Sequence, residues 1–192
     1  RLDTAWSRDT RNSFLFPTKG LFQRIAAEIG TPAGSLQYYK LSFQHQQFFQ
    51  LGKRFTLMLN GEAGIGDGLF DMSDKPLPFF KNFYAGGTST VRGFKNGTLG
   101  PKDLEGDALG GDQRVVGNAE LFFPLPGLKD DQSLRMSAFV DAGAAFGPGD
   151  ANNLYQEFAF DDLRYSAGLA LLWVSPMGPL KFSLAQPLVS KD

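Results

Sequence analysis

The side chains that could do covalent chemistry are few, and they are not spaced for it. The only histidine, His45, has no carboxylate or nucleophile at a useful spacing, so we expect a structural residue rather than a general base. Asp67, Asp71 and Asp74 lack the twelve-residue ligand pattern of a calcium loop. The sequence has no cysteine, which excludes a disulfide, a zinc–thiolate site and a thiol nucleophile. These residues therefore predict no metal site and no local catalytic group.

One long segment without a strand pattern, residues 67–113, stands out instead. It far exceeds the roughly 12–15 residues beyond which a connecting loop is usually functional or disordered. It is neither strongly charged nor poor in aromatic residues, which argues against disorder. Its middle, Phe83–Lys102, contains five glycines and a single arginine, Arg92. Glycines allow positive φ and close backbone approach, so this composition suits a loop folded into a confined space.

The segments around this loop alternate apolar and polar residues with a period of two, which predicts β-strands with one apolar face. The clearest alternation is Ser133–Phe146, and weaker versions predict about eight strands in all, near residues 2–8, 21–29, 39–46, 55–65, 114–123, 133–146, 163–173 and 180–186. Several approach or exceed the roughly 9–11 residues that cross a bilayer when tilted. Strands of soluble proteins are usually about 5–6 residues long, so strand length favours a membrane protein.

Short and long connections alternate along the chain. Outer-membrane barrels place short turns in the periplasm and long loops outside, which makes residues 67–113 an extracellular loop. Complete bacterial barrels have an even number of strands with both ends in the periplasm, whereas both ends of this chain fall on the outer side. We therefore expect a partial barrel domain over residues 1–192, lacking at least one strand before Arg1 and one after Asp192. Its unpaired edges predict a complex, a dimer or part of a longer chain.

Three sequence blocks carry a resemblance to a known family. The loop motif Val91-Arg92-Gly93-Phe94 is similar to the VRGF/Y motif of the BamA superfamily of barrel insertases and transporters. Phe139–Gly143 resembles the F-x-D-x-G strand of that family, with Gly143 as the motif glycine, and Ser175–Ser183 resembles its penultimate hairpin. The resemblance covers essentially the whole chain. It is stronger to the barrel-assembly members than to the polypeptide-secretion members.

The resemblance implies an all-β fold: an antiparallel transmembrane β-barrel of 16 strands, preceded by POTRA repeats, with the long loop folded into the lumen. It also implies that Arg92 contacts two carboxylates on the lumen wall, Glu120 and Asp141. The alternation independently places both on polar strand faces. Pairing the two strands around a turn at Pro124–Asp131 leaves these carboxylates about four residues, or roughly 13 Å, apart. We therefore expect a close contact with one carboxylate and a looser contact with the other.

For function, the resemblance implies the central subunit of the machinery that folds and inserts outer-membrane proteins of bacteria. Its partners would be unfolded outer-membrane protein clients, accessory lipoproteins and outer-membrane lipid. The mechanism would combine local thinning of the bilayer with templating of the client strand at an openable seam. Because this mechanism makes and breaks no covalent bond, the resemblance implies no enzyme activity and no cofactor. With a net charge of -1, we expect no nucleic-acid partner.

Three other functions make different predictions: one within the same superfamily and two from other classes of protein. A polypeptide-secretion porin of the same superfamily would conduct ions and export one partner. A soluble eight-stranded barrel would hold a small apolar ligand and point Leu134, Met136, Val140 and Phe146 inward, whereas the membrane barrel points them outward. An outer-membrane enzyme would need His45 clustered in space with a serine and an aspartate.

Overall fold

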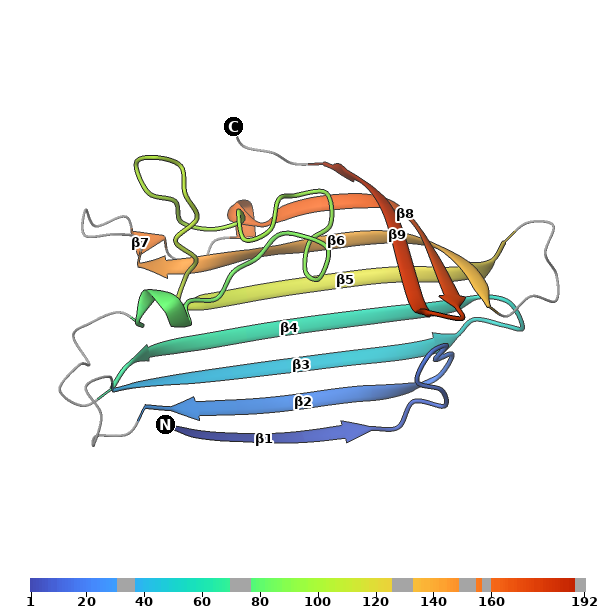
Figure 1. Cartoon of the computed structure of the whole chain (residues 1–192), viewed down its shortest axis with the longest axis horizontal. Coiled ribbons are helices and arrows are strands. Elements are labelled where there is room, and N and C mark those ends of the chain that lie inside the picture. Colours follow the sequence, from blue (N-terminus) through green and yellow to red (C-terminus); the bar gives the residue numbers. More distant parts are fainter. Residues whose placement is uncertain (31–36, 70–76, 126–132, 149–154, 157–159, 189–192) are drawn as a thin grey trace.

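The computed structural model describes residues 1–30, 37–69, 77–125, 133–148, 155–156 and 160–188, and it confirms the predicted all-β antiparallel fold (Figure 1). Eight long strands pair in chain order: β1 (Leu2–Asp9), β2 (Gly20–Ile29), β3 (Tyr38–Gln50), β4 (Thr56–Gly68), β5 (Gln113–Pro124), β6 (Leu134–Pro148), β8 (Arg164–Ser175) and β9 (Gly178–Pro187). A two-residue strand, β7 (Tyr155–Gln156), pairs only with β6. Two 3-10 turns, η2 (Phe79–Lys81) and η3 (Phe160–Asp162), complete the described elements, among which no helix is long and apolar enough to span a membrane.

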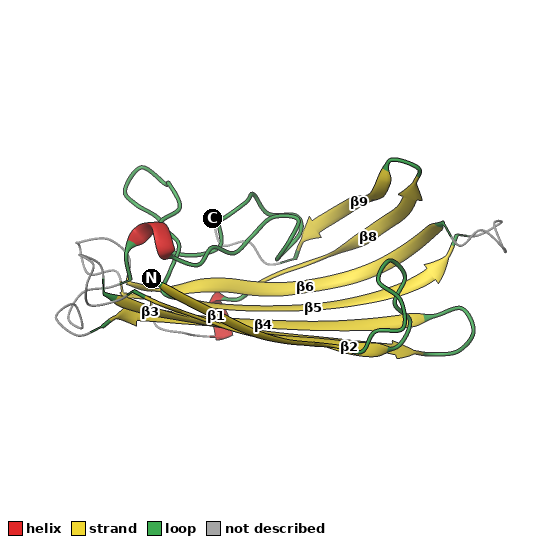
Figure 2. Cartoon of the chain, turned by 60° about the horizontal axis from the view of Figure 1, so that its bottom comes forward, coloured by secondary structure: helices red, strands yellow, loops and turns green. Residues whose placement is uncertain are grey.

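The two faces of the sheet differ in chemistry, as the alternation predicts. One face carries aliphatic and aromatic side chains in register across neighbouring strands, for example Val140 opposite Ala167 and Leu169 opposite Leu184. Val140 and Leu169 are about half exposed, at 49% and 50%. Glu120 and Asp141 lie on the opposite face, on the side to which the long loop and the β8–β9 hairpin turn (Figure 2). This arrangement contradicts a soluble barrel with an aliphatic interior.

The loop end of β6 departs from this pattern. Phe146 is fully buried although Val140, which shares its parity, is half exposed. The alternation of exposed and buried side chains does not reach this end of the strand, because Ala144, Ala145 and Phe146 are all buried. The expectation that Phe146 is exposed on the apolar face is therefore wrong, whereas Leu134 and Met136 are partly exposed.

The register between β5 and β6 also differs from the expected one. Glu120 pairs with Phe139, and Asn118 pairs with Asp141. The two carboxylates are thus offset by two residues along the strands, roughly 7 Å, and not by four. The predicted turn was too short, because β6 first pairs with Pro124 at Arg135. The shorter offset brings both carboxylates within reach of one side chain.

A small apolar cluster joins the loop to the polar face of the sheet. It consists of Ala85, Val91 and Leu99 from the loop and of Val116 and Ala145 from β5 and β6. Phe94 packs against it and is partly buried. Burying a Val or Leu side chain contributes about 1.5–3 kcal/mol, so this cluster gives the loop a packed base beside its charged contacts.

Candidate functional site

The long loop leaves β4 at Gly68, and its described part, residues 77–112, crosses the polar face before it enters β5 (Figure 1). Two isolated bridges give it internal structure, Phe83 with Gly111 and Lys102 with Ala108. The tip that carries the VRGF motif lies against β5, β6 and β9, through Arg92 and Gly93. The loop is therefore folded against the sheet, as its glycine content predicts.

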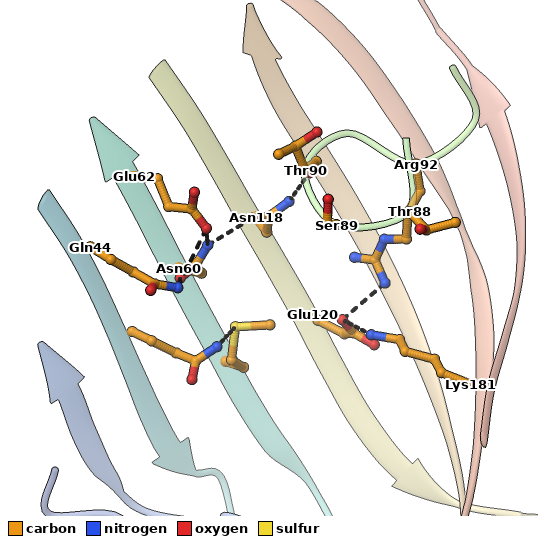
Figure 3. Close-up of a pocket in the computed structure, with 12 residues that line it drawn as sticks. Gln44, Asn60, Glu62, Thr88, Ser89, Thr90, Arg92, Asn118, Glu120 and Lys181 are labelled. Atoms are coloured by element: carbon orange, nitrogen blue, oxygen red, sulfur yellow. Dashed lines mark hydrogen bonds and ion pairs between the residues drawn. The ribbon is translucent and has the colours of Figure 1, made fainter. Parts of the chain in front are cut away.

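Arg92 is the centre of the contact between loop and sheet (Figure 3). Its Nε and Nη2 donate to the two oxygens of Asp141 at 2.7 and 2.8 Å, and its backbone N–H donates to the same carboxylate at 3.0 Å. Its Nη1 donates to Glu120 Oε2 at 3.0 Å. Both contacts are direct, so the expectation of one looser contact is wrong. Arg92 is 5% exposed, Glu120 1% and Asp141 0%.

Neighbouring side chains complete the coordination of the two carboxylates. Ser137 Oγ donates to Glu120 Oε1 at 2.5 Å, and Asn118 Nδ2 donates to Asp141 Oδ1 at 2.9 Å. The Arg92 guanidinium lies 3.4 Å from the centre of the Phe139 ring, a cation–π contact. Burial lowers the pKa of Arg92, but the bonds to Asp141 and the charges of Glu120 and Asp141 outweigh burial and raise it. Arg92 thus keeps its charge in an enclosed site.

Two glycines make the close approach of loop and sheet possible. A Cβ on Gly143 would lie 2.8 Å from the Val115 carbonyl oxygen and 3.0 Å from Val91 Cγ2 of the loop. Gly93 has a φ of +90°, and a Cβ there would lie 3.1 Å from the Cβ of Ala185 on β9. The motif glycine of β6 therefore makes room for Val91, and the motif glycine of the loop makes room for β9.

A row of amides extends the contact across three strands; the alternation predicts their polar faces but not their bonds to one another. Asn118 Nδ2 donates to the Thr90 carbonyl at 2.7 Å, beside Arg92. Asn60 Nδ2 donates to Asn118 Oδ1 at 2.9 Å, and Gln44 Nε2 donates to Asn60 Oδ1 at 3.1 Å (Figure 3). These side chains line a cavity of about 160 Å³ between the loop and β3–β5. This amide row links β3 to the loop tip, and the carboxylates of Glu62 and Asp141 accept from it.

The first part of the loop is held separately, on β2 and β3. Lys81 of η2 forms an ion pair with Glu28, which also accepts a hydrogen bond from the Tyr38 hydroxyl. Lys40 Nζ donates to the Lys81 carbonyl at 2.6 Å and lies 3.9 Å from the centre of the Phe83 ring. The described loop is therefore fixed at two places, one on β2–β3 and one on β5–β6.

The last residue of the loop, Asp112, predicts a pH dependence. Burial and, secondarily, the charge of Asp67 raise the pKa of Asp112 to about 6 from 3.8, and its Oδ1 is buried without a hydrogen-bond partner among the described residues. Because the folded pKa lies above the unfolded one, the folded state binds the extra proton between the two values. Stability is therefore lost as the pH rises from about 4 through about 6, by up to about 3 kcal/mol.

We expect this loss in the local opening of the loop end, where the Gly66 N–H donates to the Asp112 carbonyl at 2.8 Å. Hydrogen exchange of the Gly66 amide, corrected for its intrinsic pH dependence, measures that opening. Opening should be more frequent at pH 7 than at pH 4.5 in the native protein and equal at both in Asp112→Asn. Equal opening at both pH values in the native protein would disprove the prediction.

The other candidates from the sequence are not gathered into a reactive site. His45 Nδ1 bonds to Gln23 Nε2 at 3.0 Å on the apolar face, away from the loop. Asp67 accepts from the N–H of its neighbour Gly68, and Asp71 and Asp74 lie outside the described residues. Within the described ranges, no group of three or more His, Asp or Glu side chains is arranged to hold a metal ion. What the arrangement around Arg92 does is to hold a loop on a sheet.

The chain is similar to several known proteins. The Omp85 superfamily domain matches residues 1–192. The chain is 42% identical to the outer membrane protein assembly factor BamA of Neisseria meningitidis, over 97% of this chain and 26% of the relative. It is 32% identical to BamA of Nitratidesulfovibrio vulgaris, over 95% of this chain and 22% of the relative, and 28% identical to a SAM50-like protein of Schizosaccharomyces pombe, over 100% and 41%.

Among solved structures, the crystal structure of BamA from Haemophilus ducreyi lacking POTRA domains 1–3 matches with a TM-score of 0.87 and 29% identity. This match covers 98% of the present chain and 39% of that chain. The chain spans about a quarter of the length of the bacterial relatives, 26% and 22%.

Proposed function

Because the chain belongs to the Omp85 superfamily, we propose that it is part of the transmembrane barrel of an outer-membrane protein assembly factor. The observation that carries the proposal is the loop held by Arg92 on two buried carboxylates, on the polar face of a sheet whose other face is apolar. A sheet of this kind places its apolar face against lipid and its polar face toward a lumen. The relatives named as outer membrane protein assembly factors support the same assignment.

In this proposal the protein folds and inserts outer-membrane proteins into the bacterial outer membrane. Its partners are unfolded client proteins, accessory subunits of an assembly complex and the lipid itself. Local thinning of the bilayer lowers the barrier to insertion, and an exposed strand edge pairs with the incoming client strand. No bond is made or broken in either step. The protein would therefore act without a cofactor.

The loop of residues 67–113 would be extracellular at its base and would reach into the lumen at its tip. We assign Val91-Arg92-Gly93-Phe94 the role of a latch, with Glu120 and Asp141 as its wall partners and Gly143 as the position that admits Val91. Supporting this role, Arg92 uses all of its terminal nitrogens and its backbone N–H on the two carboxylates. A latch of this kind would fix the shape of the lumen face while clients fold.

The proposal is tested with the full-length protein reconstituted into lipid vesicles with its accessory subunits. We expect it to accelerate folding of an unfolded outer-membrane barrel client severalfold over protein-free vesicles, measured by the heat-modifiable shift of the client on gels. Ionic conductance across a planar bilayer is measured in parallel. Steady conductance together with client folding at the protein-free rate would favour a secretion porin and refute assembly.

A further inference from the structure

The two carboxylates beneath the loop require more positive charge than Arg92 supplies. Glu120 and Asp141 are 1% and 0% exposed, and buried charges are costly unless they are paired. Arg92 brings one positive charge to two negative ones. Ser137 and Asn118, which also bond to the carboxylates, are neutral. The remaining charge has to come from elsewhere in the sheet.

Lys181 of β9 provides it. Its Nζ donates to Glu120 Oε2 at 3.1 Å, the same oxygen that accepts from Arg92 Nη1 at 3.0 Å (Figure 3). Among the described residues, Glu120 forms ion pairs only with Arg92 and Lys181, and Asp141 only with Arg92. With two cations and two carboxylates, the cluster is neutral. One carboxylate oxygen is thus shared by the loop and by β9.

This contact depends on how the sheet bends. In the order β5-β6-β8-β9, Lys181 and Glu120 are three strand spacings apart, roughly 14 Å on a flat sheet. That distance exceeds what a lysine side chain spans, so the ion pair forms only because the β8–β9 hairpin turns over the polar face (Figure 2). The bend of the β8–β9 hairpin and the ion pair between Lys181 and Glu120 therefore stabilise each other.

The loop also touches β9 directly. Gly93 packs beside Ala185 and Pro187, which lie on the same strand face as Lys181. A cavity lined by Gly87, Phe94 and Lys95 of the loop and by Ser183 and Leu184 of β9 adjoins this contact. Displacing β9 would therefore disturb both the packing of Gly93 and the charge balance of the cluster.

We propose that Lys181 is a positioning residue of the latch, which couples the place of β9 to the seating of the loop through the shared oxygen of Glu120. The inference rests on the proposed role of the loop as a latch. The two carboxylates then have different functions. Of the loop and β9, Asp141 binds only the loop, through Arg92, whereas Glu120 binds both.

The test is hydrogen exchange of the full-length protein in lipid nanodiscs, followed in loop residues 87–93 and in β9. Lys181→Met, which keeps the length of the side chain but removes its charge, should speed exchange in both segments by at least about fivefold, and Lys181→Arg should restore both. Lys102→Met is the matched control, because Lys102 is exposed and makes no ion pair within the described ranges. It should change neither segment.

The carboxylates give an independent comparison that stays decisive if Lys181→Met does not fold. Glu120→Gln should speed exchange in the loop and in β9, whereas Asp141→Asn should speed it in the loop alone. Loop exchange that stays native in Lys181→Met, or β9 exchange that rises equally in Glu120→Gln and Asp141→Asn, would overturn the inference. These measurements do not depend on assembly activity, so a failure here is distinct from a failure of the proposed function.

Discussion

Replacing Arg92 by alanine should release the tip of the long loop from the sheet. The substitution leaves Asp141 with no ion pair among the described residues and Glu120 with only Lys181. Breaking a buried pair in this way typically costs about 3–5 kcal/mol, because the partner charge stays buried. Hydrogen exchange of residues 87–93 in the full-length protein should therefore accelerate by about a hundredfold or more. Assembly of a barrel client should slow in parallel if the latch is needed for function.

A matched substitution separates the latch from arginine loss in general. Arg11 also forms an ion pair, with Asp9 at 2.6 Å, but it lies between β1 and β2, away from the loop. Arg11→Ala should leave exchange at residues 87–93 nearly unchanged. Arg92→Lys should fall between the native protein and Arg92→Ala, because an ammonium cannot reproduce the bidentate fork on Asp141. Native exchange in Arg92→Ala would show that apolar packing alone seats the loop.

The second large effect concerns the apolar face. Val140 lies near the middle of β6 and is 49% exposed, with other aliphatic residues beside it. If this face contacts lipid, Val140→Arg should destabilise the folded protein by about 2–4 kcal/mol, the cost of a cation near the bilayer midplane. Urea unfolding of the full-length protein in lipid vesicles measures this difference.

Gln46→Arg is the control on the other face. Gln46 lines the polar cavity beside the loop, so an arginine there lies among polar side chains and not against lipid. We expect a change of less than about 1 kcal/mol. A larger loss in Gln46→Arg than in Val140→Arg would mean that the lipid-facing side has been assigned to the wrong face.

The strands could be predicted from the sequence because alternation is a local property. The pattern at Ser133–Phe146 predicts β6, which spans Leu134–Pro148, and the same reasoning finds the other seven long strands. The polar parity of Glu120 and Asp141 follows from the same alternation. The contact of Arg92 with these carboxylates was implied by the resemblance of the VRGF block to a known family, and no local pattern predicted it.

What the sequence did not predict depends on relations between distant strands. The register of β5 and β6 follows from the length of their connection, and the expected turn at Pro124–Asp131 was too short, because Pro124 pairs with Arg135. Lys181 shows only as a polar residue between Leu180 and Phe182. Its contact with Glu120 needs the bend of the β8–β9 hairpin, which alternation does not encode. The pairing of Lys81 with Glu28 likewise joins residues 53 positions apart.

The amide row of Gln44, Asn60 and Asn118 has a consequence for how the loop leaves its seat. These side chains border a cavity with room for several water molecules, and an amide exchanges a protein partner for water at little cost. Asp141, by comparison, is fully buried and does not line that cavity, so it has no exposed surface to hydrate. The barrier to release of the loop is thus concentrated at the contact of Arg92 with Asp141. The loop can leave the sheet only when water enters that contact.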